Sequence, residues 1–204
     1  WSRGLGDVYK RQVYVSTKPI ATNDTIYVRT SSSSSAQGIA SIYSFTIDGT
    51  VNWRVENSNS TMSDLAPLVY VGSGQGACGQ WPDMVLVGWS DGLLQALDAH
   101  NGAVIWQHFT EKHSWGITGS MLIEEETVTL PTRNSLDQLC LNGDLLFSQD
   151  IGYGWRNGVT FADGHYWVGD EIGNLWAVNA DVAVNYTVGN GNIRHAPMNL
   201  TTSA

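Results

Sequence analysis

One stretch of the chain matches the pattern by which serine hydrolases present a nucleophile. Residues Gly88–Gly92 read G-x-S-x-G, with Ser90 at the central position. That pattern makes a reactive hydroxyl only on a sharp turn between a strand and a helix. Here the next residues, Leu93–Leu97, are LLQAL, which predicts a strand. We therefore interpret Gly88–Gly92 as a hairpin turn and assign no catalytic residue.

A second pattern resembles a nucleotide-binding loop. Gly74, Gly76 and Gly79 read G-x-G-x-x-G after an apolar strand. Such a loop holds pyrophosphate only when a helix N-terminus follows it. The next residues, Gln80–Asp83, lead into another predicted strand, so we expect a flexible loop without a cofactor.

No metal site is predicted from the sequence. The acidic run Glu124–Glu126 is typical of a solvated strand edge. Neither H-E-x-x-H nor another paired ligand spacing occurs among the histidines, His100, His108, His113, His165 and His195. Cys78 lies in a long loop, whereas Cys140 lies in a predicted strand 62 positions later. Pairing across sheets and two separate thiols fit these positions equally well.

Composition indicates a packed globular protein. The 204 residues hold 42% hydrophobic and 14% charged residues, with 22 Gly and 9 Trp. Ten Lys and Arg against nineteen Asp and Glu give a net charge of −9. This acidity argues against a nucleic-acid partner, because phosphates bind to basic surfaces. No apolar run approaches the roughly 18 residues of a membrane span, so this segment is not expected to cross a bilayer.

The first twelve residues resemble a translated sequencing adapter and are excluded from fold reasoning. Trp1–Gln12 contains the segment DVYKRQ and holds three of the ten basic residues and one of the nineteen acidic ones. The remainder therefore has a net charge of −11. We expect residues 13–204 to be a fragment of a longer protein.

Internal repeats predict the fold. Each copy has short apolar strands separated by Gly turns and closes on an aromatic residue. The copies are Asp24–Trp53, Asp83–Trp106, Glu126–Phe147 and Gly164–Tyr186, and the closing aromatics follow at intervals of 53, 41 and 39 residues. A further apolar strand precedes each of the last three copies. Repeats of about 40–45 residues with four strands are typical of β-propeller blades.

The turn residues fit antiparallel hairpins. Asx-Gly or Gly-Asn pairs supply the positive φ of tight turns, and they occur at Asp48-Gly49, Asp91-Gly92, Asn101-Gly102, Asn142-Gly143 and Gly173-Asn174. The sequence predicts an all-β fold, a β-propeller fragment of about four four-stranded antiparallel blades in an open arc. The expected blades are residues 13–56, 57–110, 111–150 and 151–190, with the start of another blade in 191–204.

The second repeat resembles the tryptophan-docking motif of the pyrroloquinoline-quinone-like propeller repeat family, A-x-D-x-x-x-G-x-x-x-W. The matching positions are Ala96, Asp98, Gly102 and Trp106. Looser copies of the motif consist of Asp48, Gly49 and Trp53 and of Asn142, Gly143 and Phe147. The last copy ends at Tyr186 and has no glycine at the motif position. The resemblance implies that each aromatic stacks on a neighbouring blade. A buried Trp removes about 150–250 Å² from water, so we interpret these residues as structural.

A ligand surface is expected at the loops that enter the first strand of each blade. Two aromatics, two guanidinium groups and a His stand at comparable places there and could stack on and hold an anionic ligand. The candidate residues are Asp64, Trp115, Trp155, Arg156, Arg194 and His195. The alternative is that the tryptophans pack between blades and the arginines pair with acids.

Two functions remain after these exclusions. The preferred one is a non-catalytic binding or scaffold module outside the cytoplasm, with a protein, small-molecule or carbohydrate ligand and no cofactor. The resemblance supports it, because the family includes a propeller lipoprotein that assists outer-membrane protein assembly. The alternative is a fragment of a quinoprotein alcohol or sugar dehydrogenase, which would require pyrroloquinoline quinone and calcium. Fold similarity alone does not choose between them.

Overall fold

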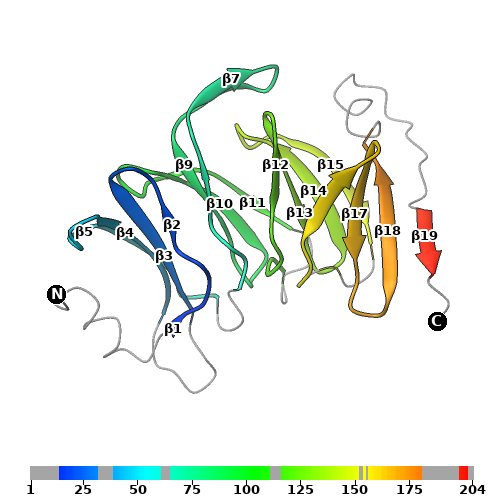
Figure 1. Ribbon diagram of the computed structural model, residues 1–204, viewed down its shortest axis with the longest axis horizontal. Coiled ribbons are helices and arrows are strands. Elements are labelled where there is room, and N and C mark those ends of the chain that lie inside the picture. The colour runs from blue at the N-terminus through cyan, green and yellow to red at the C-terminus, as the bar shows by residue number, and fades with distance from the viewer. Residues whose placement is uncertain are drawn as a thin grey trace. The chain divides into compact units, whose positions relative to one another are not determined.

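The computed structural model consists of antiparallel β-sheets and their turns (Figure 1). It describes residues 14–31, 39–60, 65–110, 116–151, 154, 156–180 and 198–201. None of these residues belongs to a helix that could cross a bilayer. The chain divides into two compact units, Trp1–Gly74 with Pro82–Thr118 and Gln75–Trp81 with Gly119–Ala204.

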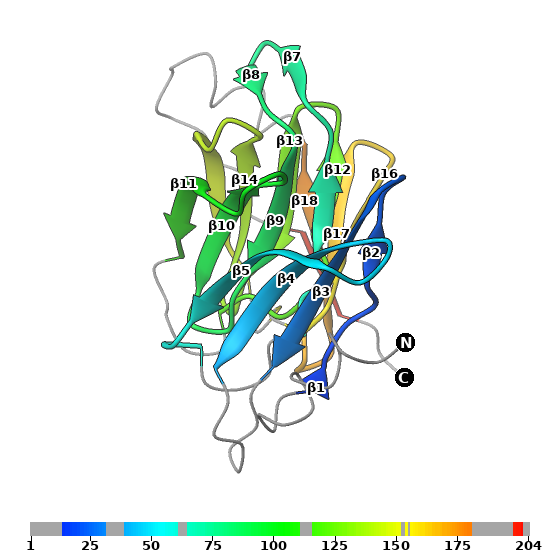
Figure 2. The ribbon, with the colours of Figure 1, turned by 90° about the vertical axis from the view of Figure 1, so that its left-hand side faces the viewer.

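The first unit contains two sheets. The first sheet has the order β1-β3-β4-β5, and β2 pairs with the N-terminal part of β3. Figure 2 shows β3, β4 and β5 side by side. The bounds are Tyr14–Val15 for β1, Ile20–Ala21 for β2, Thr25–Ser31 for β3, Ala40–Thr46 for β4 and Val51–Asn57 for β5. The second sheet has the order β11-β10-β9-β6, with bounds Val69–Val71 for β6, Met84–Gly88 for β9, Leu93–Asp98 for β10 and Val104–Phe109 for β11.

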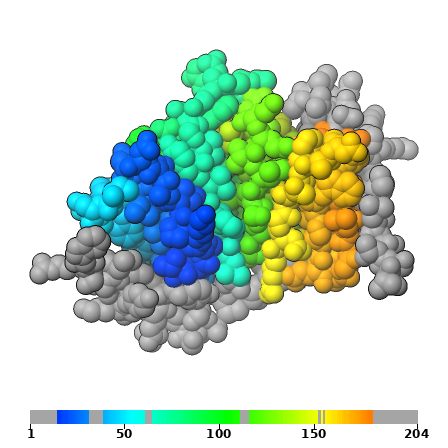
Figure 3. Space-filling view, viewed as in Figure 1, coloured from blue at the N-terminus to red at the C-terminus, as the bar shows by residue number. Residues whose placement is uncertain are grey.

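The second unit contains two sheets and a hairpin. The third sheet runs in sequence order through β12 (Leu122–Glu124), β13 (Thr127–Pro131), β14 (Ser135–Cys140) and β15 (Leu145–Asp150). The fourth runs through β16 (Val159–Ala162), β17 (His165–Gly169), β18 (Asn174–Asn179) and β19 (Met198–Thr201). The hairpin pairs β7 (Gly74–Gly76) with β8 (Gly79–Trp81). Figure 3 shows the green surface of the third sheet directly beside the yellow and orange surface of the fourth.

The five predicted turns are confirmed, since the glycine of each has a positive φ: Gly49, Gly92, Gly102, Gly143 and Gly173. The repeat is also visible in the strand register. In the first three sheets the pairing of the last two strands shifts by one residue, after Ser44, Ala96 and Gln138. The residues opposite these positions are Trp53, Trp106 and Phe147. The closing aromatics therefore occupy one structural position in three successive sheets.

The fourth sheet differs from the sequence prediction at its last strand. Residues 191–204 were expected to begin a further blade, but Met198–Thr201 pairs with β18 and completes the fourth sheet. Met198 lies opposite Ala177, at the position of the closing aromatic. Tyr186, which was predicted for that position, lies outside the described residues. Local sequence patterns could not predict that β18 pairs with β19, because the two strands are far apart in the sequence.

Each unit has an apolar core between its two sheets, as expected for sheets that bury one face against a neighbour. In the first unit the core includes Tyr27, Ile42, Trp53, Val85, Val87, Trp89 and Leu97. In the second unit it includes Leu136, Phe147, Ile151, Tyr166, Val168 and Val178. Strands from both sheets contribute to each core, so burial of apolar area ties sheets that share no hydrogen-bonded ladder.

Candidate functional site

The best copy of the docking motif forms a capped turn between β10 and β11. The Asp98 carboxylate accepts hydrogen bonds from the amides of His100 (2.8 Å) and Asn101 (3.0 Å). Gly102 has a φ of +74°, which a glycine adopts without the strain that a side chain would add. The carbonyl of Ala99 points out of this turn and is available to a neighbouring side chain.

The closing aromatic of the first sheet docks on this turn. Trp53 is 8% exposed, and its indole Nε1 donates to the carbonyl oxygen of Ala99 at 3.0 Å. Its ring lies so close to Gly102 that a Cβ there would be 2.8 Å from the ring. The resemblance implied that an aromatic of one blade stacks on its neighbour, and Trp53 has this contact. Gly102 is thus required both for the turn and for the space that the indole fills.

The other motif residues have parts of the same arrangement. Phe147 is buried with its ring centroid 6.3 Å from that of Tyr166 in the fourth sheet. Trp106 is half-buried opposite Ala96. The carboxylate of Asp48 accepts from Thr46 and Thr50, and these hydrogen bonds lower its pKa.

Two buried polar side chains join Trp53 in the first unit, and the sequence analysis missed both. Tyr27 donates through its hydroxyl to the Ala99 carbonyl at 3.2 Å, and burial raises its pKa to about 12. Arg29 is fully buried, donates from Nη1 to the carbonyl of Ala66 at 2.7 Å and holds its Cζ 5.2 Å from the ring centre of Trp89. Desolvated cation–π pairs are worth about 2 kcal/mol. Because side chains alternate along a strand, Tyr27 and Arg29 lie on one face of β3. This alternation was the sequence signal from which their burial could have been predicted.

The second unit contains two buried polar networks of its own. Gln138 is 2% exposed and donates through Nε2 to the hydroxyls of Thr129 (2.9 Å) and Tyr166 (2.6 Å). Asp170 accepts from the indole of Trp176 at 2.9 Å and from the amide of Asn174 at 2.7 Å. Burial opposes ionisation of Asp170, but these hydrogen bonds outweigh it and lower its pKa.

The G-x-S-x-G stretch is a hairpin, as predicted. β9 ends at Gly88 and β10 begins at Leu93, with no helix between them. The hydroxyl of Ser90 is buried and lies 2.8 Å from the hydroxyl of Ser60. This contact joins two serines of the packed interior, and a serine hydroxyl does not act as the general base that a nucleophile needs.

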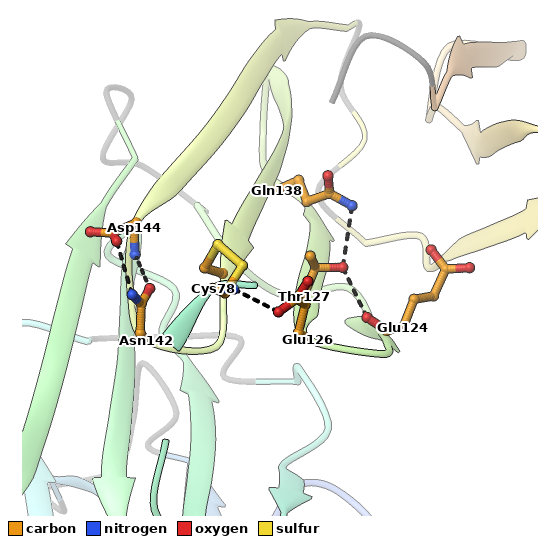
Figure 4. Close-up of a disulfide and its surroundings, with 8 residues drawn as sticks. Cys78, Glu124, Glu126, Thr127, Gln138, Asn142 and Asp144 are labelled. Atoms are coloured by element: carbon orange, nitrogen blue, oxygen red, sulfur yellow. Dashed lines mark hydrogen bonds between the residues drawn. A yellow bond between two sulfur atoms is a disulfide. The ribbon is translucent and has the colours of Figure 1, made fainter. Parts of the chain in front are cut away.

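The G-x-G-x-x-G stretch was expected to be a flexible loop, but it forms the β7–β8 hairpin; no helix N-terminus follows it, as predicted. Cys78 at its tip is joined to Cys140 by a disulfide with a Cα–Cα distance of 5.7 Å (Figure 4). The pairing that the sequence left open is thus present. The amide of Cys78 also donates to the carboxylate of Glu126 at 2.7 Å, so one of the three acidic residues holds the hairpin.

Ionisable groups elsewhere form pairs. His100 Nε2 lies 3.5 Å from Asp83, whose pKa is lowered mainly by the hydrogen bond from the amide of Ser73. Among the described residues, no three His, Cys, Asp or Glu side chains are grouped so that they could hold a metal ion.

Little of the predicted ligand surface can be placed. Arg156 is the candidate that lies among the described residues, and its Nε is 3.3 Å from Glu171 on the fourth sheet. This pair matches the alternative in which the arginines of the surface pair with acids. The other candidates, Asp64, Trp115, Trp155, Arg194 and His195, lie outside the described residues. The surface therefore stays a prediction.

Comparison with solved structures shows the class of fold. The chain is similar to BamB from Moraxella catarrhalis, with a TM-score of 0.57 and 18% identity over 79% of this chain and 44% of that one. It is also similar to quinohemoprotein alcohol dehydrogenase from Comamonas testosteroni, with a TM-score of 0.60 and 16% identity over 85% of this chain and 34% of that one. A third similar structure is the computationally designed Ika4 protein, with a TM-score of 0.55 and 14% identity over 82% of this chain and 92% of that one.

These likenesses confirm the expected fold. The sheets are blades of a β-propeller, the fold of these neighbours. The chain spans less than half the length of the two natural proteins. No protein-family model and no curated protein sequence matches the chain.

Proposed function

We propose that the chain is part of a β-propeller protein that acts outside the cytoplasm as a non-enzymatic binding or scaffold module. One observation carries the proposal: among the described residues, the motifs that resemble catalytic or binding motifs have structural roles in the sheets and their turns. Ser90 contacts Ser60 in the interior, and Asp98 caps a turn. The likeness to BamB supports the same function.

The disulfide supports the location. Cys78 and Cys140 are bonded although they are 62 positions apart in sequence. Disulfides persist in oxidising compartments such as the periplasm, the cell surface or the secreted milieu, and they are rare in the cytosol. Export is tested by expressing the chain in oxidising and reducing bacterial compartments. The proposal expects a larger fraction of chains with the Cys78–Cys140 bridge, measured by thiol alkylation, from the oxidising compartment, and an equal fraction contradicts it.

The second candidate is a fragment of a quinone-dependent alcohol or sugar dehydrogenase, favoured by the likeness to the Comamonas testosteroni enzyme. The two functions are separated by incubating the chain with pyrroloquinoline quinone and calcium, removing unbound quinone and measuring quinone absorbance and alcohol-dependent dye reduction. The binding function expects neither signal. Saturable turnover with an alcohol or sugar would overturn it. A quinohemoprotein alcohol dehydrogenase serves as the positive control.

The ligand surface that we propose comprises Asp64, Trp115, Trp155, Arg156, Arg194 and His195. Arg156 supports it through its exposure, since its side chain is 53% exposed, although it pairs with Glu171 at 3.3 Å. Exposed ion pairs contribute about 0–1 kcal/mol, so an anionic group of a protein, small molecule or carbohydrate can replace Glu171.

The surface is tested by binding of an acidic peptide and of a uronic-acid oligosaccharide, measured by calorimetry. We expect Arg156→Ala to weaken binding of the preferred probe about fivefold to tenfold, the loss of one charge-assisted contact. Arg133→Ala, which removes a cation from the turn between β13 and β14, is the matched control. Equal effects of the two substitutions would argue against the surface.

A further inference from the structure

The third sheet uses its docking turn differently from the second sheet. Cys140 stands where the second sheet has Asp98: the amide of Asp98 donates to Ala103 O and that of Cys140 to Asp144 O, both at 2.8 Å. The amides of Gly102 and Gly143 donate back to these two residues in the same way. The position of the capping carboxylate is therefore occupied by a disulfide sulfur.

The turn of the third sheet does not depend on that disulfide. Asn142 accepts from the amide of Asp144 at 3.0 Å and donates from its side chain to the Asp144 carboxylate at 2.9 Å (Figure 4). The amide of Leu141 donates to the carbonyl of Glu126 at 2.8 Å. These bonds hold the turn by ordinary hydrogen bonding, so the disulfide is left with another role.

The β7–β8 hairpin is the part that needs the bridge. Its strands have three residues each, and an isolated two-stranded hairpin is marginally stable at best in water. Gln75, Ala77 and Gln80 are exposed, and no residue of the hairpin is fully buried, although Trp81 is half-buried. Two attachments join Cys78 to the third sheet, the disulfide and the hydrogen bond to Glu126.

We propose that the Cys78–Cys140 disulfide is a redox-sensitive lock that holds the β7–β8 hairpin against the third sheet, and that reduction releases the hairpin while the sheets stay folded. Cys78 is half-buried whereas Cys140 is 4% exposed, so an attacking thiolate reaches the sulfur of Cys78. A dithiol reductant supplies the two electrons. Its first thiolate forms a mixed disulfide with Cys78 and expels Cys140 as a thiolate, which takes up a proton. Its second thiol then closes a disulfide within the reductant and frees Cys78 as a thiol.

Hydrogen exchange of the whole chain, followed by mass spectrometry, tests the lock. We expect dithiothreitol, or the double substitution Cys78→Ser with Cys140→Ser, to speed exchange in residues 72–82 at least tenfold. Exchange in β13, β14 and β15 should change less than twofold. Unchanged exchange in the hairpin would overturn the proposal, and so would an equal loss of protection in the third sheet.

Glu126→Gln separates the two attachments. This substitution removes the charge from the acceptor of the Cys78 amide but leaves the bridge intact. The proposal expects exchange in residues 72–82 to rise less than threefold in the oxidised variant. A rise as large as that caused by reduction would show that the carboxylate holds the hairpin, and the lock would be refuted.

Discussion

The indole of Trp53 in the first sheet lies over Gly102 in the second, where a Cβ would come within 2.8 Å of the ring. The same indole donates to the carbonyl of Ala99 at 3.0 Å. A single aromatic side chain therefore joins two sheets by packing and by a hydrogen bond. Phe147 has the corresponding register position in the third sheet and packs with Tyr166 in the fourth.

Removal of the Trp53 indole should destabilise the first unit strongly. Trp53→Ala leaves a cavity between two sheets and is expected to lower the free energy of unfolding by about 3–5 kcal/mol. Urea unfolding followed by circular dichroism measures this change. Val51→Ala on the same strand is the control, because Val51 is 47% exposed and its loss should cost less than about 0.5 kcal/mol. Similar costs at the two positions would contradict the docking contact.

The phenol of Tyr27 should make the chain sensitive to alkali. Burial raises its pKa to about 12, with further contributions from Tyr70 and Asp24. In the unfolded chain the phenol ionises near its ordinary pKa of about 10. Stability from Tyr27 is therefore complete below about pH 10 and is lost as the pH rises towards 12.

Tyr27→Phe tests this alkaline sensitivity. The substitution removes one hydrogen bond to Ala99, which still accepts from Trp53, so the cost near neutral pH is about 0.5–1.5 kcal/mol. The loss of stability between about pH 10 and 12 should become shallower in the variant. The free energy of unfolding of the parent chain and of the variant is measured across this pH range. If the two decrease in parallel, Tyr27 is not the source of the alkaline sensitivity.

The buried carboxylate of Asp170 should make the chain sensitive to acid. Its folded-state pKa is lowered, because hydrogen bonds from Trp176, Asn174 and Ile172 outweigh the cost of burial. A lowered pKa contributes stability that is present above the unfolded value of about 3.9 and is lost as the pH falls through the folded value. Protonation would remove an acceptor from several donors at once.

Asp170→Asn should cost about 1–3 kcal/mol near neutral pH, because the new amide nitrogen faces hydrogen-bond donors. It should also flatten the loss of stability below about pH 4. Asp163→Asn, at an exposed turn of the same sheet, is the control and should retain the parent profile. A profile of Asp170→Asn that falls as steeply in acid as that of the parent would contradict this role.

Sequence reasoning identified the repeat because its signals are local. The Asx-Gly turns require positive φ, and the closing aromatics Trp53, Trp106 and Phe147 recur at one register position. Both signals are visible within a few residues of the chain. The hairpin at Ser90 was likewise predictable, because LLQAL after Gly92 has the composition of a strand.

Features that depend on distant segments were not predictable. Arg29 is buried because Trp89 and the Ala66 carbonyl, far along the chain, surround it. Met198–Thr201 completes a sheet across a long connection. For Cys78 and Cys140, spacing says nothing of distance in the fold. The ligand surface stays a prediction for another reason: its residues were chosen by analogy between loops, and all of them except Arg156 lie outside the described residues.

The account depends most directly on the contact between Trp53 and Gly102, and a double-mutant cycle measures it. Gly102→Ala is compared with Gly49→Ala, since both glycines have positive φ but a Cβ at Gly49 would meet nothing within 4 Å. Urea unfolding should show that Gly102→Ala costs about 1–3 kcal/mol more than Gly49→Ala, the cost of overpacking. This excess should vanish in a Trp53→Ala background. An equal cost at the two glycines, or an excess that persists without the indole, would contradict the docking of one sheet on the next.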